Sequence, residues 1–191
     1  GFSYIVTWPG ARTNNKGIAL NIEEMPQAAT LARDSGFDYI SFKAFLDRTE
    51  GDCRSEVVGI KKENDHYTTT VASIRKAVRT AQEIGTSDFK TIIATNLRAL
   101  LTETEGDYKN QPKQCHMTAL RQVMGLEGLA ICPVYREVES IRIGTQDAYL
   151  PGEFVATLAR TAERIRTFDA QKTCKDVVCM YNAVNWAIEG F

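Results

Sequence analysis

Cysteine is the residue type with the clearest capacity for chemistry in this chain of 191 residues. Four of its five cysteines lie in the second half, with the spacing C-x16-C-x41-C-x4-C. Because the sequence shows no secretory pattern, we expect a cytoplasmic protein whose thiols stay reduced, and clustered reduced thiols favour a metal site over disulfides. The predicted ligands are Cys115, Cys132, Cys174 and Cys179.

The class of metal follows from the type and spacing of these ligands. Four thiolates in a tetrahedral arrangement suit zinc or an iron–sulfur cluster. Zinc ribbons normally carry two C-x2-C pairs, which this sequence lacks, and the pair Cys132–Pro133 favours an iron–sulfur cluster. Two alternatives stay open: a structural zinc module that docks a partner, and a metal-free α/β enzyme fragment in which the cysteines are buried small residues.

The second half of the sequence contains elements that would bring these thiols together. Residues 115–136 indicate two short strands around Gly-Leu-Glu-Gly, and such a hairpin returns Cys132 to the level of Cys115. A helix over residues 153–170 is long enough to carry the chain back toward the hairpin. Its helical spacing is set by Phe154, Leu158, Ile165 and Phe168. The last two cysteines then fall within one terminal turn.

The first half alternates strands and helices. Residues 2–8 are β-branched and aromatic, and residues 37–45 have the same strand character. Between them, residues 21–36 show helical spacing, with Asn21 as the predicted N-cap and Gly36 as the stop. A strand–helix–strand order usually closes a parallel pair by a right-handed crossover.

A further helix and strand continue this order. Residues 68–84 place four apolar side chains on one face, and residues 89–95 predict a third strand before a short helix. The four apolar residues of the longer helix are Val71, Ile74, Val78 and Ala81.

The strand at residues 37–45 has one apolar and one polar face. Alternation assigns the first to Ile40, Phe42 and Ala44 and the second to Tyr39, Ser41 and Lys43. Lys43, near the carboxyl end of the strand, is a candidate contact for a carboxylate or phosphate of a substrate or cofactor. A solvated lysine at a strand end is the alternative.

Composition places a domain boundary in the polar stretch at residues 102–114, which contains Gly and Pro. We predict two domains, residues 1–104 and residues 105–191. The formal charge is −1, so charge gives no reason to expect nucleic acid or a membrane as a partner. The longest apolar runs are also far shorter than the ~20 residues of a membrane span.

Together these motifs resemble one enzyme family. The order Cys115, hairpin turn, Cys132–Pro133, helix, Cys174 and Cys179 resembles the twitch or SPASM region that follows the barrel in many radical S-adenosylmethionine (radical SAM) enzymes. The preceding strand–helix–strand, with GFDYISFKAFL in its second strand, resembles the last part of that family's partial barrel. The implied fold class is α/β: the C-terminal part of a partial (β/α)6, TIM-like barrel, followed by a small α+β domain.

The resemblance also implies cofactors and partners. A twitch-like domain implies one auxiliary 4Fe-4S cluster, bound by the four cysteines, that assists radical modification of a peptide or small-molecule substrate. The family's C-x3-C-x2-C loop, whose own 4Fe-4S cluster cleaves S-adenosylmethionine, does not occur in this sequence. Because the family carries that loop upstream and the first residues already have strand character, we expect the C-terminal portion of a longer enzyme, inactive alone, with the upstream half as its partner.

Several other residues give weaker signals. Cys53, in a charged loop, is a candidate reactive thiol or substitute ligand, or an ordinary thiol. His116 is a candidate donor to the sulfur beside it, or an ordinary polar histidine. For Tyr135 and Arg136 we expect a structural role, with the arginine offsetting thiolate charge. Ordinary packing with exposed amides is expected for Asn182, Asn185 and Trp186.

Overall fold

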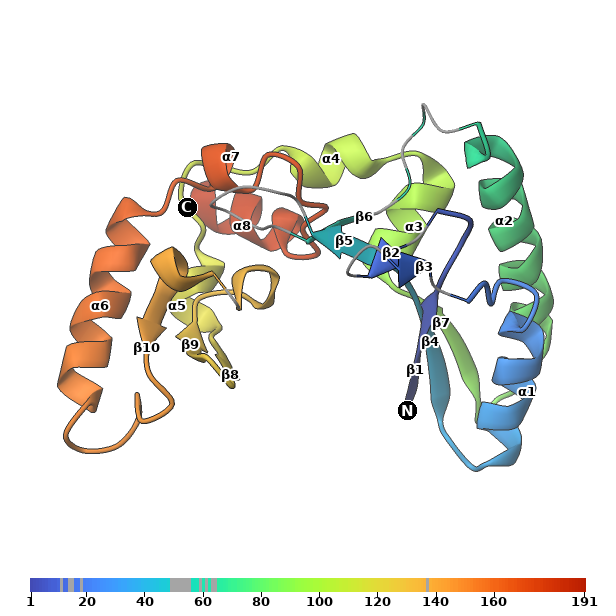
Figure 1. Ribbon diagram of the computed structural model, residues 1–191, viewed down its shortest axis with the longest axis horizontal. Coiled ribbons are helices and arrows are strands. Elements are labelled where there is room, and N and C mark those ends of the chain that lie inside the picture. The colour runs from blue at the N-terminus through green and yellow to red at the C-terminus, as the bar shows by residue number, and fades with distance from the viewer. Residues whose placement is uncertain are drawn as a thin grey trace. The chain divides into compact units, whose positions relative to one another are not determined.

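The computed structural model describes residues 1–10, 12–13, 16–17, 19–48, 56–58, 60, 62, 65–136 and 138–191. The chain divides into two compact units (Figure 1). The first contains Gly1–Asp47 and Val58–Glu105, and the second contains Gly106–Phe191 with the described residues of Arg48–Val57. In the part of the chain that the structure describes, no helix has both the length and the apolar character needed to cross a membrane.

The first unit is built on a parallel three-stranded sheet. Its strands are β1 (Phe2–Val6), β4 (Tyr39–Ala44) and β7 (Lys90–Ile93), with β4 in the middle. Phe2 pairs with Ile40 across β1 and β4, and Tyr39 pairs with Lys90 across β4 and β7. Parallel pairing requires a crossover between successive strands, and the intervening helices provide it.

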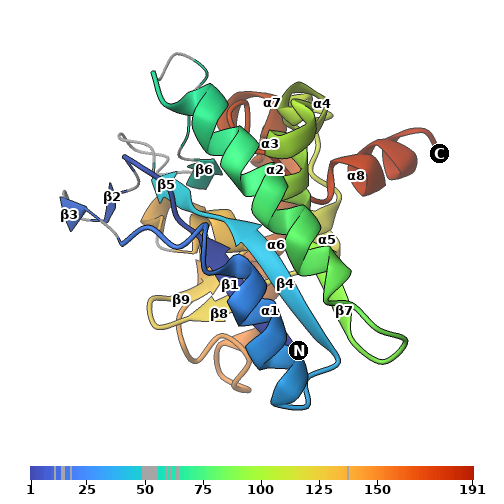
Figure 2. The ribbon, with the colours of Figure 1, turned by 90° about the vertical axis from the view of Figure 1, so that its right-hand side faces the viewer.

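Helices α1 (Met25–Asp34) and α2 (Tyr67–Glu83) pack against each other and against the sheet (Figure 2). The alternation predicted for β4 is confirmed, because Ile40 and Phe42 are 0% exposed whereas Lys43 is exposed. The predicted apolar face of α2 is also buried: it consists of Val71, Ile74, Val78 and Ala81. Apolar burial against these helices therefore fixes which face of each strand points inward.

The end of α1 matches its prediction, but its start does not. Gly36 has φ +80° and ends the helix. Its N–H donates to the Arg33 carbonyl, and the Phe37 N–H donates to the Ala32 carbonyl. Asn21 does not cap the helix. Its side chain accepts from the Thr7 N–H at 2.8 Å and donates to the Ile5 carbonyl at 2.9 Å. The amide thus extends the hydrogen bonding of β1 beyond its last residue.

Shorter elements complete the first unit and lead into the second. α3 (Thr95–Thr102) follows β7, and α4 (Glu105–Lys109) spans the division between the units. Two small strand pairs are formed by β2 (Arg12–Thr13) with β3 (Lys16–Gly17) and by β5 (Leu46–Arg48) with β6 (Glu56–Val58).

The second unit contains an antiparallel sheet. The predicted hairpin is present as β8 (Val123–Gly125) and β9 (Gly128–Ala130), which pair with Gly125 opposite Gly128. A third strand, β10 (Arg142–Gly144), pairs with the other edge of β9 and was not predicted. The hairpin therefore supplies two strands of a three-stranded sheet, with β9 in the middle.

Short helical segments surround this sheet. They are α5 (Met117–Leu120), the 3-10 turns η1 (Pro133–Tyr135) and η2 (Glu139–Ile141), α6 (Phe154–Thr167), α7 (Ala170–Thr173) and α8 (Asn182–Glu189). The mixed α/β class is confirmed, whereas the barrel and twitch assignments stay predictions.

The packing face predicted for α6 is correct only at its end, where Phe168 is buried. Phe154 and Leu158 are 42% and 51% exposed, and the helix instead buries Thr157 and Thr161. The Thr161 hydroxyl donates to the Thr157 carbonyl at 2.8 Å, so the buried face has no unpaired hydroxyl at that position. Threonine methyl groups can then pack inward at little polar cost.

Candidate metal centre

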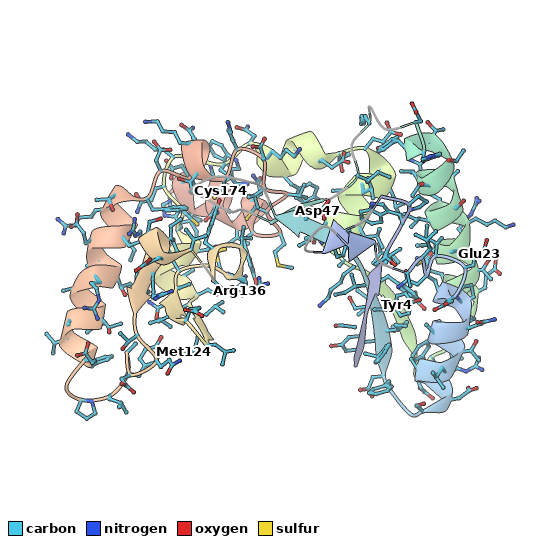
Figure 3. All side chains as sticks on the ribbon, viewed as in Figure 1. Tyr4, Glu23, Asp47, Met124, Arg136 and Cys174 are labelled. Carbon is cyan, nitrogen blue, oxygen red and sulfur yellow. The ribbon has the colours of Figure 1, made fainter. Side chains whose placement is uncertain are left out.

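All four predicted ligands belong to the second unit and are free thiols of intermediate exposure. Three of them, Cys115, Cys132 and Cys174, pack against the apolar core of that unit. Figure 3 shows Cys174 among the side chains of this unit. The core consists of Leu129, Ile131, Tyr135, Val138, Ile141, Ile143, Ala148, Phe168 and Ala170. The sulfurs are therefore held at the margin of a packed core.

The four thiols lie close enough to influence one another's ionisation. The pKa of Cys132 is raised to about 11, mainly by burial and in smaller part by negative charge on Cys179 and Cys115. The pKa of Cys174 is raised to about 12, mainly by burial, and negative charge on each of the other three thiols also acts to raise it. Segments that are distant in sequence therefore bring their sulfurs into one region of the second unit.

Two of the sulfurs accept hydrogen bonds from the backbone that follows them. The Val134 N–H donates to Cys132, and the Tyr181 N–H donates to Cys179. Each donor lies two residues after its cysteine, because the chain turns back around the sulfur. Such N–H groups stabilise a thiolate, which is the form that binds metal.

The other two sulfurs accept hydrogen bonds from side chains. The Tyr135 hydroxyl lies 2.7 Å from the Thr173 carbonyl and 3.4 Å from Cys174 Sγ, and its one proton is shared between these two acceptors. The Asn185 amide donates to Cys115 Sγ at 3.8 Å. Every one of the four sulfurs thus has a donor, and for these two the donor can be removed by mutation.

Helix α8 holds the segment before Cys115 in place. Asn182 and Trp186 both donate to the Asn110 carbonyl at 2.7 Å. Asn185 accepts from the Met117 N–H at 3.2 Å, in addition to its contact with the sulfur. The expectation of exposed amides is wrong, because Asn185 is 1% exposed and Asn182 is also buried. Their i, i+3 spacing, which puts both on one helix face, was the available signal.

Two predicted helpers of the site have other partners. His116 Nε2 lies 2.6 Å from Glu189 Oε2, so this histidine joins α8 through an ion pair or hydrogen bond. Arg136 donates to the Pro133 carbonyl at 2.8 Å. Burial raises the pKa of Cys132 and of Cys179, and the charge of Arg121 opposes that effect at both thiols.

The two remaining candidate residues lie elsewhere. Lys43 is exposed on the face of β4 opposite the buried one, within the first unit. Its proposed contact with a substrate or cofactor stays a prediction. Cys53 lies outside the described residues.

The donor set fits a thiophilic metal, because it offers four sulfurs and a hydrogen bond to each. Among the described residues, however, no three His, Cys, Asp or Glu side chains already have the geometry of a metal site. The sulfurs converge without forming a ready-made coordination shell, so binding would require them to move closer together. The metal-ligand assignment therefore stays a prediction.

No family model, no curated protein sequence and no solved structure matches the chain.

Proposed function

We propose that the second unit binds an auxiliary 4Fe-4S cluster through Cys115, Cys132, Cys174 and Cys179. The observation that carries this proposal is that four distant cysteines share one region and that each sulfur accepts a hydrogen bond. A buried thiol that is only a small apolar residue has no need of such donors. A thiolate ligand does, because hydrogen bonds to sulfur offset its charge and set the potential of the centre.

Local geometry favours iron–sulfur over structural zinc. Cys132 is followed by Pro133 and the turn η1, and the Val134 N–H points back to the sulfur. The sequence lacks the paired C-x2-C turns that place two sulfurs of one turn on a zinc ion. Wide, irregular spacing is compatible with a cluster whose ligands come from separate segments.

The wider function that we propose is that of a radical SAM enzyme, of which this chain supplies the C-terminal portion. The first unit would be part of the barrel, and S-adenosylmethionine with its own cluster would be bound mainly by the upstream portion. Four protein thiolates leave a cluster no open iron position, so the auxiliary cluster would supply an electron-accepting centre. The substrate would be a peptide or a small molecule.

Anaerobic reconstitution with iron and sulfide tests the cluster. The wild-type chain should become brown and retain iron and acid-labile sulfide in equal amounts after desalting. Alanine variants of each of the four ligands should lose most of both, because removing one thiolate opens the coordination shell.

Cys53→Ala is the matched control, since it also removes one of the five cysteines. It should retain the wild-type amounts of iron and sulfide. One tightly bound zinc and no sulfide in the wild type would instead support a zinc module. Loss of the cluster in Cys53→Ala would show that the ligand set is wrong, and absence of any metal would favour a metal-free protein.

A further inference from the structure

Arg121 and Tyr181 connect two of the cysteine-bearing segments. The Arg121 guanidinium carbon lies 4.5 Å from the centre of the Tyr181 ring. Arg121 directly follows α5. In the first turn of that helix, the Thr118 N–H donates to the Cys115 carbonyl at 3.2 Å. The arginine is thus anchored to the segment that carries Cys115.

Tyr181 is anchored to the other segment. Its N–H donates to the sulfur of Cys179, two residues earlier, and it directly precedes α8. Stacking of the guanidinium on the ring therefore joins the Cys115 segment to the Cys179 turn by a contact that involves neither sulfur. Both side chains are partly buried, which strengthens a cation–π contact relative to one in water.

The stack also fixes where the charge of Arg121 lies. It holds the guanidinium against Tyr181, two residues after Cys179, and therefore beside the Cys179 turn. Four thiolates around a metal or cluster leave a net negative charge in a partly desolvated place, and a fixed guanidinium nearby lowers the free energy of that charge. Delocalised charge and a planar shape allow arginine to do this while stacked on a ring, which lysine does less well.

We propose that the Arg121–Tyr181 stack positions the metal centre, fastening the Cys115 segment to the Cys179 turn and holding a positive charge beside that turn. The inference rests on the proposed function, because it requires that the four thiolates bind a metal or cluster. Arg121 and Tyr181 act through the cysteines as positioning residues and do not themselves contact the metal.

Titration of the metal-free full chain with Co²⁺ gives a direct readout, because cobalt–thiolate absorption reports on the sulfur ligands. Arg121→Gln should weaken Co²⁺ binding by about tenfold, within the range seen when a partner of a metal ligand is removed. Tyr181→Leu should weaken it in the same direction, because the guanidinium loses its platform. Tyr181→Phe keeps the ring and should bind as the wild type does.

A second readout separates charge from simple loss of structure. In the reconstituted protein, Arg121→Gln should lower the reduction potential of the cluster, because a positive charge near the centre favours the reduced state. Arg166→Gln is the charge-matched control: it removes one arginine from an exposed pair with Glu163 on α6 and should change neither affinity nor potential.

Two results would overturn the inference in distinguishable ways. If the wild type binds Co²⁺ and a cluster, but Arg121→Gln matches Arg166→Gln in both affinity and potential, the stack has no such role and the cluster proposal survives. If the wild type binds neither Co²⁺ nor a cluster, the proposed function fails and the inference falls with it. Circular dichroism of the metal-free variants shows that each is folded before titration.

Discussion

The Asn185 side-chain amide donates to Cys115 Sγ at 3.8 Å although 70 residues separate the two. The same side chain accepts from the Met117 N–H at 3.2 Å. One buried asparagine on α8 therefore fixes both a candidate ligand and the first residue of α5. These contacts join Cys115 and α5 to α8, so the fold brings the beginning and the end of the second unit together.

Replacing Asn185 should destabilise the metal-free protein. Asn185→Leu leaves the partly buried Met117 N–H without its partner, which should cost about 1 kcal/mol, the low end of the range for an unsatisfied group. Urea unfolding of the metal-free protein measures the loss. Val184→Ala, on the adjacent exposed position of α8, should stay within about 0.5 kcal/mol of the wild type. Equal effects of the two changes would show that the amide bonds are unimportant.

Two buried tyrosines should respond oppositely to loss of their hydroxyl groups. Tyr135→Phe removes the bonds to Cys174 and Thr173 and should cost about 1 kcal/mol. The Tyr67 hydroxyl, in the first unit, is buried and has no hydrogen-bond partner among the described residues. Tyr67→Phe should therefore leave stability unchanged or raise it by up to about 1 kcal/mol.

The measurement for this pair is the urea midpoint of each variant in the metal-free state. A clear loss of stability in Tyr67→Phe would mean that its hydroxyl makes an important interaction in solution. A neutral Tyr135→Phe would remove the argument that its hydroxyl supports Cys174.

The hairpin before Cys132 depends on Gly128. It has φ +112°, and a Cβ placed there would collide with the Gly144 carbonyl oxygen. Gly128→Ala should lower stability by about 1–3 kcal/mol, because an alanine is strained at this φ. The clash with a backbone oxygen also cannot be relieved by moving a side chain.

Gly125 is the matched control for this change. It sits opposite Gly128 in the same hairpin, and a Cβ there would meet nothing closer than 3.9 Å. Thermal unfolding of the two alanine variants makes the comparison. Similar melting temperatures would show that the hairpin tolerates a side chain at Gly128 by rearranging, and that the register seen here is not fixed.

The metal-free protein should lose stability in alkali through its thiols. Burial raises the pKa of Cys132 to about 11 and of Cys174 to about 12, above the ordinary value of 9.0. The folded state therefore holds these protons more tightly than the unfolded chain does. The stabilisation is complete below pH 9.0 and is lost as the pH rises through the raised values.

Comparison of urea stability at pH about 8 and about 11 measures this loss. Cys174→Ala should show a smaller decrease between the two conditions than the wild type, since it lacks one of the titrating groups. An equal decrease would contradict the assignment. The same raised pKa values predict that metal binding releases protons and therefore tightens with increasing pH.

Sequence patterns were reliable where burial depends on local periodicity. The alternation on β4 and the helical spacing on α2 each identify a buried face, because one apolar face packs against one layer. On α6 the same reasoning identified the buried Phe168 but failed in the first half of the helix. The buried residues there are Thr157 and Thr161, and the apolar Phe154 and Leu158 are exposed. Spacing identifies an apolar face but not whether that face meets a partner.

The chemical surroundings of the cysteines depend on contacts that no local pattern contains. The candidate ligands and the hairpin between Cys115 and Cys132 could be predicted from the sequence. The role of Asn185 could not, because the sulfur that it contacts lies 70 residues away. No local pattern indicates either that the charge of Arg121 acts on Cys132 and Cys179. Pairing of this kind is set by how the segments pack.

X-ray absorption at the iron edge of the anaerobically reconstituted protein tests the central claim most directly. If Cys115, Cys132, Cys174 and Cys179 ligate one auxiliary cluster, the iron will be surrounded by sulfur alone, with a short iron–iron distance, and this signal will vanish in each of the four alanine variants. Iron bound by nitrogen or oxygen, or a sulfur shell that persists in those variants, would contradict it.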